Sequence, residues 1–174
     1  MIFREARPDD SAALGAVHVA SWRETYAGIV PEQLLAGLSE DERAAMWRTV
    51  LENPALGSVF VAEAEGEIVG FGACGAQRDV ELKSLGYEGE IGAIYVLRSH
   101  QGSGLGASLM RLMATRLLDK GRTAASLWVL SDNLPARAFY ERLGGVLVGE
   151  RLEEQTGLSE VAYGWSDLEA LAPR

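Results

Sequence analysis

Several residue types are scarce in this chain, and each scarcity narrows its class. The 174 residues include one cysteine, so no disulfide can form within the chain, as is typical of proteins in a reducing cytoplasm. No apolar run approaches the roughly 18 to 20 residues that a membrane-spanning helix needs. Charged residues interrupt the first ten positions, unlike a secretory signal. We therefore expect a cytoplasmic protein without a membrane partner.

The chain is also poor in basic residues. Lys and Arg number 16 against 25 Asp and Glu, which gives a formal net charge of −9. Nucleic acid requires a basic surface, so we expect no nucleic-acid partner. The acidic excess is consistent with solubility alone and also with attraction of a cationic amine. An anionic ligand would have to be held by backbone amides and local arginines.

The order of apolar patterns predicts the fold class. The length, without repeats or linkers, predicts one domain over residues 1–174. The patterns predict a strand, helices, three strands, a helix, a strand, a helix and two strands, with a charged loop over 78–89. This order predicts an α/β (α+β) fold with a mixed, mostly antiparallel sheet of about seven strands. Its parallel part is expected in a central strand–helix–strand unit.

That central unit lies in the stretch from Glu90 to Met113. Residues 90–97 are rich in Ile, Val and Tyr, which is typical of a buried strand. A polar turn with glycine at 102, 104 and 106 follows, and apolar residues then recur at helical spacing. The free N–H groups and the macrodipole of a helix N-terminus attract anions, and glycine lets an anion approach the backbone. The stretch therefore predicts a phosphate or pyrophosphate site.

Two known phosphate-binding patterns fit this loop poorly. A P-loop ends in Gly-Lys-Ser/Thr, and no lysine occurs between residues 90 and 119. Gly102, Gly104 and Ala107 match the dinucleotide fingerprint GxGxxG/A, but four residues separate the first glycine from the strand. The next strand also lacks an acidic residue at its end, although Asp132 lies just beyond it. A nucleotide-dependent oxidoreductase is therefore disfavoured.

A family resemblance accounts for the loop better. Residues 101–106, Gln-Gly-Ser-Gly-Leu-Gly, resemble the Gln/Arg-x-x-Gly-x-Gly/Ala signature of the GNAT superfamily, the acetyl-CoA-dependent N-acetyltransferases. Residues 94–96 stand where the family's splayed strand meets the pantetheine arm of the cofactor. Residues 133–144 are similar to the family's Asn-x-x-Ala-x-x-Phe-Tyr-x-x-x-Gly helix. The resemblance, clearest over residues 58–166, implies the GNAT fold and acetyl-CoA as acetyl donor; we expect no metal.

The resemblance also implies which residues hold the cofactor. Val96 would offer its backbone N–H and C=O to the pantetheine amides as in strand pairing, and its N–H would stabilise an oxyanion. Asn133 would cap its helix and hydrogen-bond the pantetheine arm. Together with Tyr140, the implied cofactor-binding residues are Ile94, Tyr95, Val96, Gln101, Gly102, Ser103, Gly104, Leu105, Gly106 and Asn133.

Two residues are candidates for the chemistry. Direct acetyl transfer to an amine through a tetrahedral intermediate needs a base for the amine proton and an acid for the leaving thiolate. Glu90 lies eleven residues before Gln101, the spacing of the catalytic glutamate in the family's histone-acetylating branch, and is the candidate base. Glu88 or water are the alternatives. Tyr140 is the candidate acid from its position in the family motif; packing in the core is the alternative.

The acceptor side is less determined by the sequence. Trp22 and Tyr26 lie at i and i+4 of a predicted helix and either wall an acceptor pocket or pack in the core. Aromatic faces bind cations, which favours a small cationic amine, with an amino acid or a peptide or protein N-terminus as alternatives. A homodimer through the edge of the closing hairpin is possible. A catalytically silent acyl-CoA-binding regulatory module of the same fold is the alternative to an enzyme.

Overall fold

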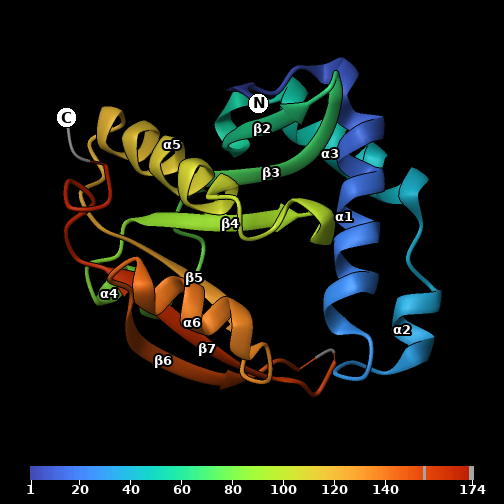
Figure 1. Cartoon of the computed structure of the whole chain (residues 1–174). Coiled ribbons are helices and arrows are strands. Elements are labelled where there is room, and N and C mark those ends of the chain that lie inside the picture. Colours follow the sequence, from blue (N-terminus) through green and yellow to red (C-terminus); the bar gives the residue numbers. More distant parts are fainter. Residues whose placement is uncertain (155, 173–174) are drawn as a thin grey trace.

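A seven-stranded sheet forms the centre of the molecule. A computed structural model describes residues 1–154 and 156–172 (Figure 1). The strand order is β1-β2-β3-β4-β5-β7-β6, and every neighbouring pair is antiparallel except β4 and β5. The predicted fold class, mixed and mostly antiparallel, is confirmed. The strands are β1 (Ile2–Glu5), β2 (Ser58–Ala64), β3 (Glu67–Ala76), β4 (Gly89–Val96), β5 (Ala125–Leu130), β6 (Val146–Leu152) and β7 (Ser159–Trp165).

Helices cover both faces of this sheet. α1 and α3 pack on one face, and α5 and α6 pack on the other (Figure 1). The helices are α1 (Ser11–Tyr26), α2 (Glu32–Ala36), α3 (Glu40–Glu52), α4 (Val80–Ser84), α5 (Leu105–Asp119) and α6 (Leu134–Arg142), with short 3-10 turns η1 (Pro8–Asp10), η2 (Pro54–Leu56) and η3 (Arg98–His100).

One helix lies where the sequence predicts a loop. α4 occupies the middle of the charged segment 78–89. The side chain of Asp79 caps it by accepting a hydrogen bond from the Leu82 N–H at 3.0 Å, and Leu82 is buried. A single buried leucine within a charged segment gives no helical periodicity, so the pattern alone missed this element.

Close contact between α5 and β3 positions the start of α5. A Cβ on Gly72 would lie 2.8 Å from the Met113 side chain, and one on Gly70 would lie 3.0 Å from Leu105 Cδ2. Only glycine at these two strand positions leaves room for the helix. Met113 and Leu105 are almost fully buried as a result. The approach fixes the N-terminus of α5 beside the end of β4.

The only parallel strand pair of the described residues is very short. β4 and β5 are paired at Gly89↔Ala125 and Glu90↔Ser126 alone. The register of β4 with β3 also shifts near Gly92, and such a bulge bends a strand. Beyond Glu90 the two strands therefore diverge, and Figure 1 shows the end of β4 reaching toward α1 while β5 turns away. We call this opening the β4–β5 split.

Candidate functional site

The glycine loop lies at one end of the β4–β5 split. Gly104 is the N-cap of α5 with φ +82°, and Gly102 has φ +75°. Both conformations are left-handed and favour glycine. Nothing lies within 4 Å of a Cβ placed on either residue, so their backbone faces open space. The first-turn amides of this 15-residue helix lack intrahelical acceptors and carry its positive dipole end, which is suited to an anion.

The last residues of β4 form the side of the split. Because pairing with β5 stops at Glu90, the edge of β4 that faces β5 has no strand partner over residues 91–96. Gln101 Nε2 donates to the Val96 carbonyl at 3.0 Å and ties the loop to the end of this strand. A free strand edge beside an anion site can hold an extended amide-containing chain through backbone hydrogen bonds.

Three tyrosine hydroxyls gather beside the split, one each from α1, β4 and α6. Tyr140 of α6 is buried, and burial raises the pKa of its hydroxyl well above the usual range. The nearby Tyr26 and Tyr95 raise the Tyr140 pKa further. Burial likewise raises the pKa of Tyr26 to about 12 and raises that of Tyr95. All three groups therefore remain protonated donors at neutral pH.

Asn133 links α6 to α1 at this point. Its Oδ1 accepts a hydrogen bond from the Ala136 N–H at 3.3 Å, as predicted for a helix cap. Asn133 lies close enough to Tyr26 to lower the pKa of that hydroxyl, against the larger effect of burial. Asn133 is buried. The structure thus brings together Asn133, Tyr26 and Tyr140, three residues that separate sequence patterns indicated.

Trp22 packs on Tyr26, and we call Trp22, Tyr26, Tyr95 and Tyr140 the aromatic group. The ring centroids of Trp22 and Tyr26 are 4.6 Å apart in an edge contact, and both side chains are half-buried. The Trp22 N–H lowers the pKa of Tyr95, but it is buried and has no hydrogen bond of normal geometry among the described residues. A buried donor without a partner of normal geometry is uncommon.

His18 packs beneath this group, although no sequence pattern assigned it a role in the site. Its ring stacks on Tyr95 with a centroid distance of 4.6 Å. Its Nδ1 accepts a hydrogen bond from Trp47 Nε1 at 3.1 Å, so the neutral ring carries its proton on Nε2. Burial, aided by the charge of Arg43, lowers the pKa of His18 to about 4. His18 is therefore a neutral packing residue.

This histidine predicts a pH dependence of stability. Its folded pKa of about 4 lies below the unfolded value of 6.5, so the unfolded chain binds more protons between these values. The stabilisation is complete above pH 6.5 and is lost as the pH falls toward 4. We expect the free energy of unfolding to drop by about 2 kcal/mol between pH 7 and pH 5 from this group alone. Urea titrations at pH 7 and pH 5 should show this drop in the free energy of unfolding for the unmodified protein and not for His18→Gln. An equal drop in both proteins would contradict the prediction.

Glu90 lies at the apex of the split, and its carboxylate is paired with Arg78. Its carboxylate accepts two hydrogen bonds from the Arg78 guanidinium, both at 2.8 Å, and one from the Arg78 N–H at 3.2 Å. The Glu90 side chain is 17% exposed, whereas that of Arg78 is 80% exposed. No hydrogen bond among the described residues joins Glu90 to Tyr140. Protonation of Glu90 would therefore weaken its charged hydrogen bonds with Arg78.

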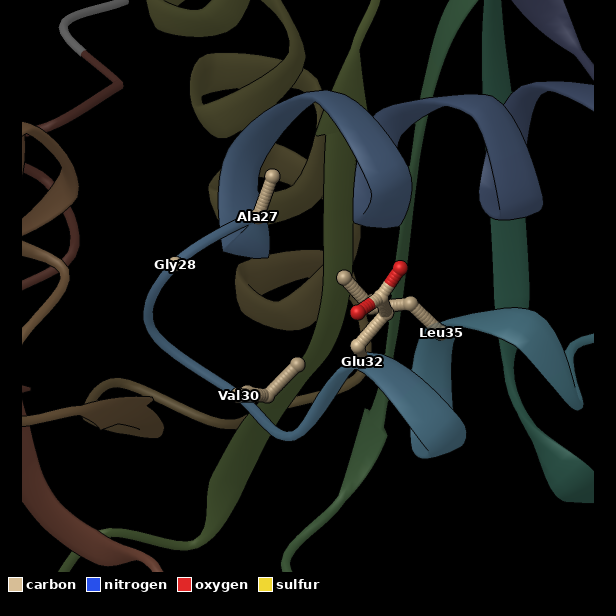
Figure 2. Close-up of a pocket in the computed structure, with 5 residues that line it drawn as sticks. All are labelled: Ala27, Gly28, Val30, Glu32 and Leu35. Carbon is tan, nitrogen blue, oxygen red and sulfur yellow. The ribbon is translucent and has the colours of Figure 1, made fainter.

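A cavity of about 380 Å³ adjoins the aromatic group. Ala27, Gly28, Val30, Glu32 and Leu35 line it, and Figure 2 shows Val30 and Glu32 pointing into the space between the α1–α2 loop and α2. Trp22 and Tyr26 pack against Val30 and Leu35, the apolar part of this lining. Among the described residues, the Glu32 carboxylate has no ion-pair or hydrogen-bond partner. The lining therefore combines apolar side chains with one exposed carboxylate.

These features together define a class. The split between two parallel strands, the glycine loop and the buried tyrosine beside them are the features that the sequence resemblance to the GNAT superfamily implies. The sequence model of the Acetyltransferase (GNAT) family matches residues 19–145. The chain belongs to the GNAT family of N-acetyltransferases.

Relatives agree with this placement. The chain is 37% identical to the uncharacterized N-acetyltransferase YuaI of Bacillus subtilis over 171 residues, 97% of this chain and 94% of that protein. It is 34% identical to the mycothiol acetyltransferase of Streptomyces coelicolor over 142 residues, 79% of this chain but only 40% of that protein.

Two solved structures share the fold. The PaiA N-acetyltransferase of Thermoplasma acidophilum, solved with coenzyme A, has a TM-score of 0.76 at 17% identity and covers 94% of this chain and 98% of its own. YncA of Salmonella typhimurium, solved with acetyl-CoA, has a TM-score of 0.70 at 20% identity and covers 97% of this chain and 94% of its own. Within residues 1–154 and 156–172, no helix is long and apolar enough to span a membrane.

Proposed function

We propose that the protein is an enzyme that transfers acetyl from acetyl-CoA to a primary amine. The observation that carries the proposal is the buried Tyr140 hydroxyl, which lies with Tyr95 of β4 beside the split. The residues present fit acetyl-CoA: the open backbone of the glycine loop suits the pyrophosphate, and the unpaired β4 edge suits the pantetheine amides. Bound acetyl-CoA supplies an activated thioester.

Each residue then has a defined task. The Val96 N–H would stabilise the negative charge on the carbonyl oxygen as the amine nitrogen attacks the thioester carbon. Tyr140 would donate its proton to sulfur as the carbon–sulfur bond breaks, and would regain a proton from solvent. Glu90, once released from Arg78, would accept the proton that the amine loses; water reaching the split is the alternative.

The acceptor is proposed to be a small cationic amine. Glu32 gives the cavity a negative charge, and the aromatic faces of Trp22 and Tyr26 favour cations. The net charge of −9 acts in the same direction at long range. An acceptor with two ammonium groups could place one at Glu32 while the other, deprotonated, reacts near Tyr140.

Removing the charge of Glu32 tests this assignment. We expect Glu32→Gln to raise KM for a diamine about three- to five-fold, the strength of a solvent-exposed ion pair, with little change for a monoamine of equal length. Steady-state kinetics at low salt are the measurement. An equal effect on both amines, or none on either, would remove Glu32 from the acceptor site.

A thiol-release assay tests the activity itself. Acetyl-CoA with a primary amine should release coenzyme A and yield the acetylated amine by mass spectrometry, whereas the pre-acetylated amine should give no reaction. A Glu90→Gln variant in the same assay distinguishes the two proposed bases. A large fall in kcat would indicate that Glu90 is the base, whereas an unchanged kcat would indicate water. Cofactor binding without turnover on mono- and diamines, amino acids and peptides would instead support the silent regulatory module.

A further inference from the structure

A long-range contact joins α1 to the segment that precedes the glycine loop. The Arg98 N–H donates to Glu24 Oε2 at 2.8 Å, and Arg98 Nη2 donates to the Glu24 backbone carbonyl. The two residues are 74 positions apart in the chain. Figure 1 shows the connection from β4 to α5 running beside α1. Glu24 thus caps η3 from outside, because Arg98 is the first residue of that turn.

Packing does little to hold this segment. Arg98 and residues 101–104 are exposed, and no atom lies within 4 Å of a Cβ placed on Gly102 or Gly104. Leu97 N–H donates to the Val69 carbonyl at 3.0 Å, which fixes the start of the segment to β3. From residue 98 to residue 104, the hydrogen bonds to a distant part of the chain, among the described residues, are those made with Glu24. Between the two fixed ends of the loop, at Leu97 and at the buried Leu105, Glu24 therefore supplies the long-range contacts of the described residues.

Hydrogen bonds between neighbouring residues connect Arg98 to the rest of the loop. The Gln101 N–H donates to the Arg98 carbonyl at 3.2 Å, and Gln101 Nε2 donates to the Val96 carbonyl at 3.0 Å. Ser103 Oγ donates to the His100 carbonyl at 2.7 Å. Arg98, once fixed, thus orients the amides that precede α5 and the strand edge at Val96.

We propose that Glu24 is a positioning residue that holds the glycine loop in place for the cofactor and joins it to α1, the helix that carries Trp22 and Tyr26. The inference rests on the proposed function, because the loop is assigned to acetyl-CoA. Trp22 and Tyr26 lie in the same turns of α1 as Glu24, so one helix touches the acceptor side and the cofactor loop. Pre-organising a binding loop raises affinity by lowering the entropy lost on binding.

The experiment compares Glu24→Ala, which removes the side-chain acceptor of the Arg98 N–H but keeps the backbone carbonyl, with Glu24→Gln, which keeps one side-chain oxygen. Coenzyme A binding is measured by calorimetry, and exchange of the amides of residues 98–104 is measured by hydrogen–deuterium exchange without ligand. We expect Glu24→Ala to weaken coenzyme A binding about ten-fold and to speed exchange in the loop, with Glu24→Gln close to the unmodified protein. Acetyl-CoA KM should rise in parallel, while kcat changes less than about three-fold.

The control is Glu52→Ala, which removes an exposed glutamate of α3 whose partner is Arg48 on the same helix. It should change neither readout, and thermal unfolding shows whether each variant is folded. Unchanged coenzyme A affinity or unchanged loop exchange in folded Glu24→Ala overturns the positioning role. Failure of the unmodified protein to bind coenzyme A overturns the proposed function itself, which the exchange data alone would not show.

Discussion

Replacing Tyr140 by phenylalanine should lower kcat for acetyl transfer by about a hundred-fold or more, the usual contribution of a general acid. Coenzyme A affinity should stay within about two-fold, because the ring remains. That ring contacts Tyr163 and Trp165 at centroid distances of 6.0 and 6.1 Å, and phenylalanine preserves both contacts. Burial raises the Tyr140 pKa, so its hydroxyl is protonated throughout the neutral pH range of such an assay.

Tyr163→Phe provides a matched control for this prediction. Tyr163 is also buried in the same core, but its hydroxyl donates to Glu141 at 2.5 Å and accepts from Arg137 at 3.1 Å. Loss of that hydroxyl should lower stability and leave kcat nearly unchanged. Pre-steady-state measurement of thiol release compares the two variants. A kcat for Tyr140→Phe equal to that of the control would mean that Tyr140 serves only as a core aromatic.

Replacing Gly104 by alanine should weaken coenzyme A binding at least ten-fold. A residue other than glycine in the left-handed conformation costs roughly 1–2 kcal/mol, and Gly104 has φ +82°. The added methyl group would also stand where the loop is open to an anion. The strain lowers the stability of the folded protein, whereas the methyl group acts on the ligand contact, so the affinity should fall in addition to the stability.

Gly121→Ala separates the two effects. Gly121 follows the other end of α5, has φ +76°, and also has nothing within 4 Å of a Cβ placed on it. The backbone strain is therefore matched, while the anion site is untouched. Calorimetric titration and thermal unfolding of both variants should show similar losses of stability and a loss of affinity in Gly104→Ala alone. Equal affinities would place the phosphate elsewhere.

Features that depend on local sequence could be predicted well. The glycine loop precedes α5 as expected, because the glycines and the helical repeat are neighbours in the chain. Asn133 caps α6 for the same reason. The order of strands and helices follows from short-range apolar patterns, and that order indicated the class of sheet.

Ion pairs between distant segments could not be predicted from sequence patterns. Arg78 pairs with Glu90, and Glu24 accepts hydrogen bonds from Arg98 across 74 positions. A charged residue has many possible partners in a chain with 16 basic and 25 acidic residues. Which pair forms depends on how the elements pack. The pairing of Glu90 with Arg78 and the contact of Glu24 with the glycine loop are therefore visible only in the folded structure.

The aromatic group could be predicted in part. His18 shares a helix face with Trp22 and Tyr26, and that spacing was a usable signal for a common cluster. The hydrogen bond that His18 accepts from Trp47 depends on how α3 packs against α1, which no local pattern specifies. The neutral state of His18 follows from this packing, so the sequence alone could not indicate it.

Calorimetric titration of the protein with acetyl-CoA, run beside coenzyme A, NAD and ATP, tests the proposed cofactor most directly. We predict saturable binding of acetyl-CoA and coenzyme A, and no comparable binding of NAD or ATP, because only the first two combine a pyrophosphate with a pantetheine arm that can pair with β4. Binding of NAD in preference to acetyl-CoA would contradict this prediction. The glycine loop would then be a dinucleotide site, and Glu90 and Tyr140 would lose their proposed roles.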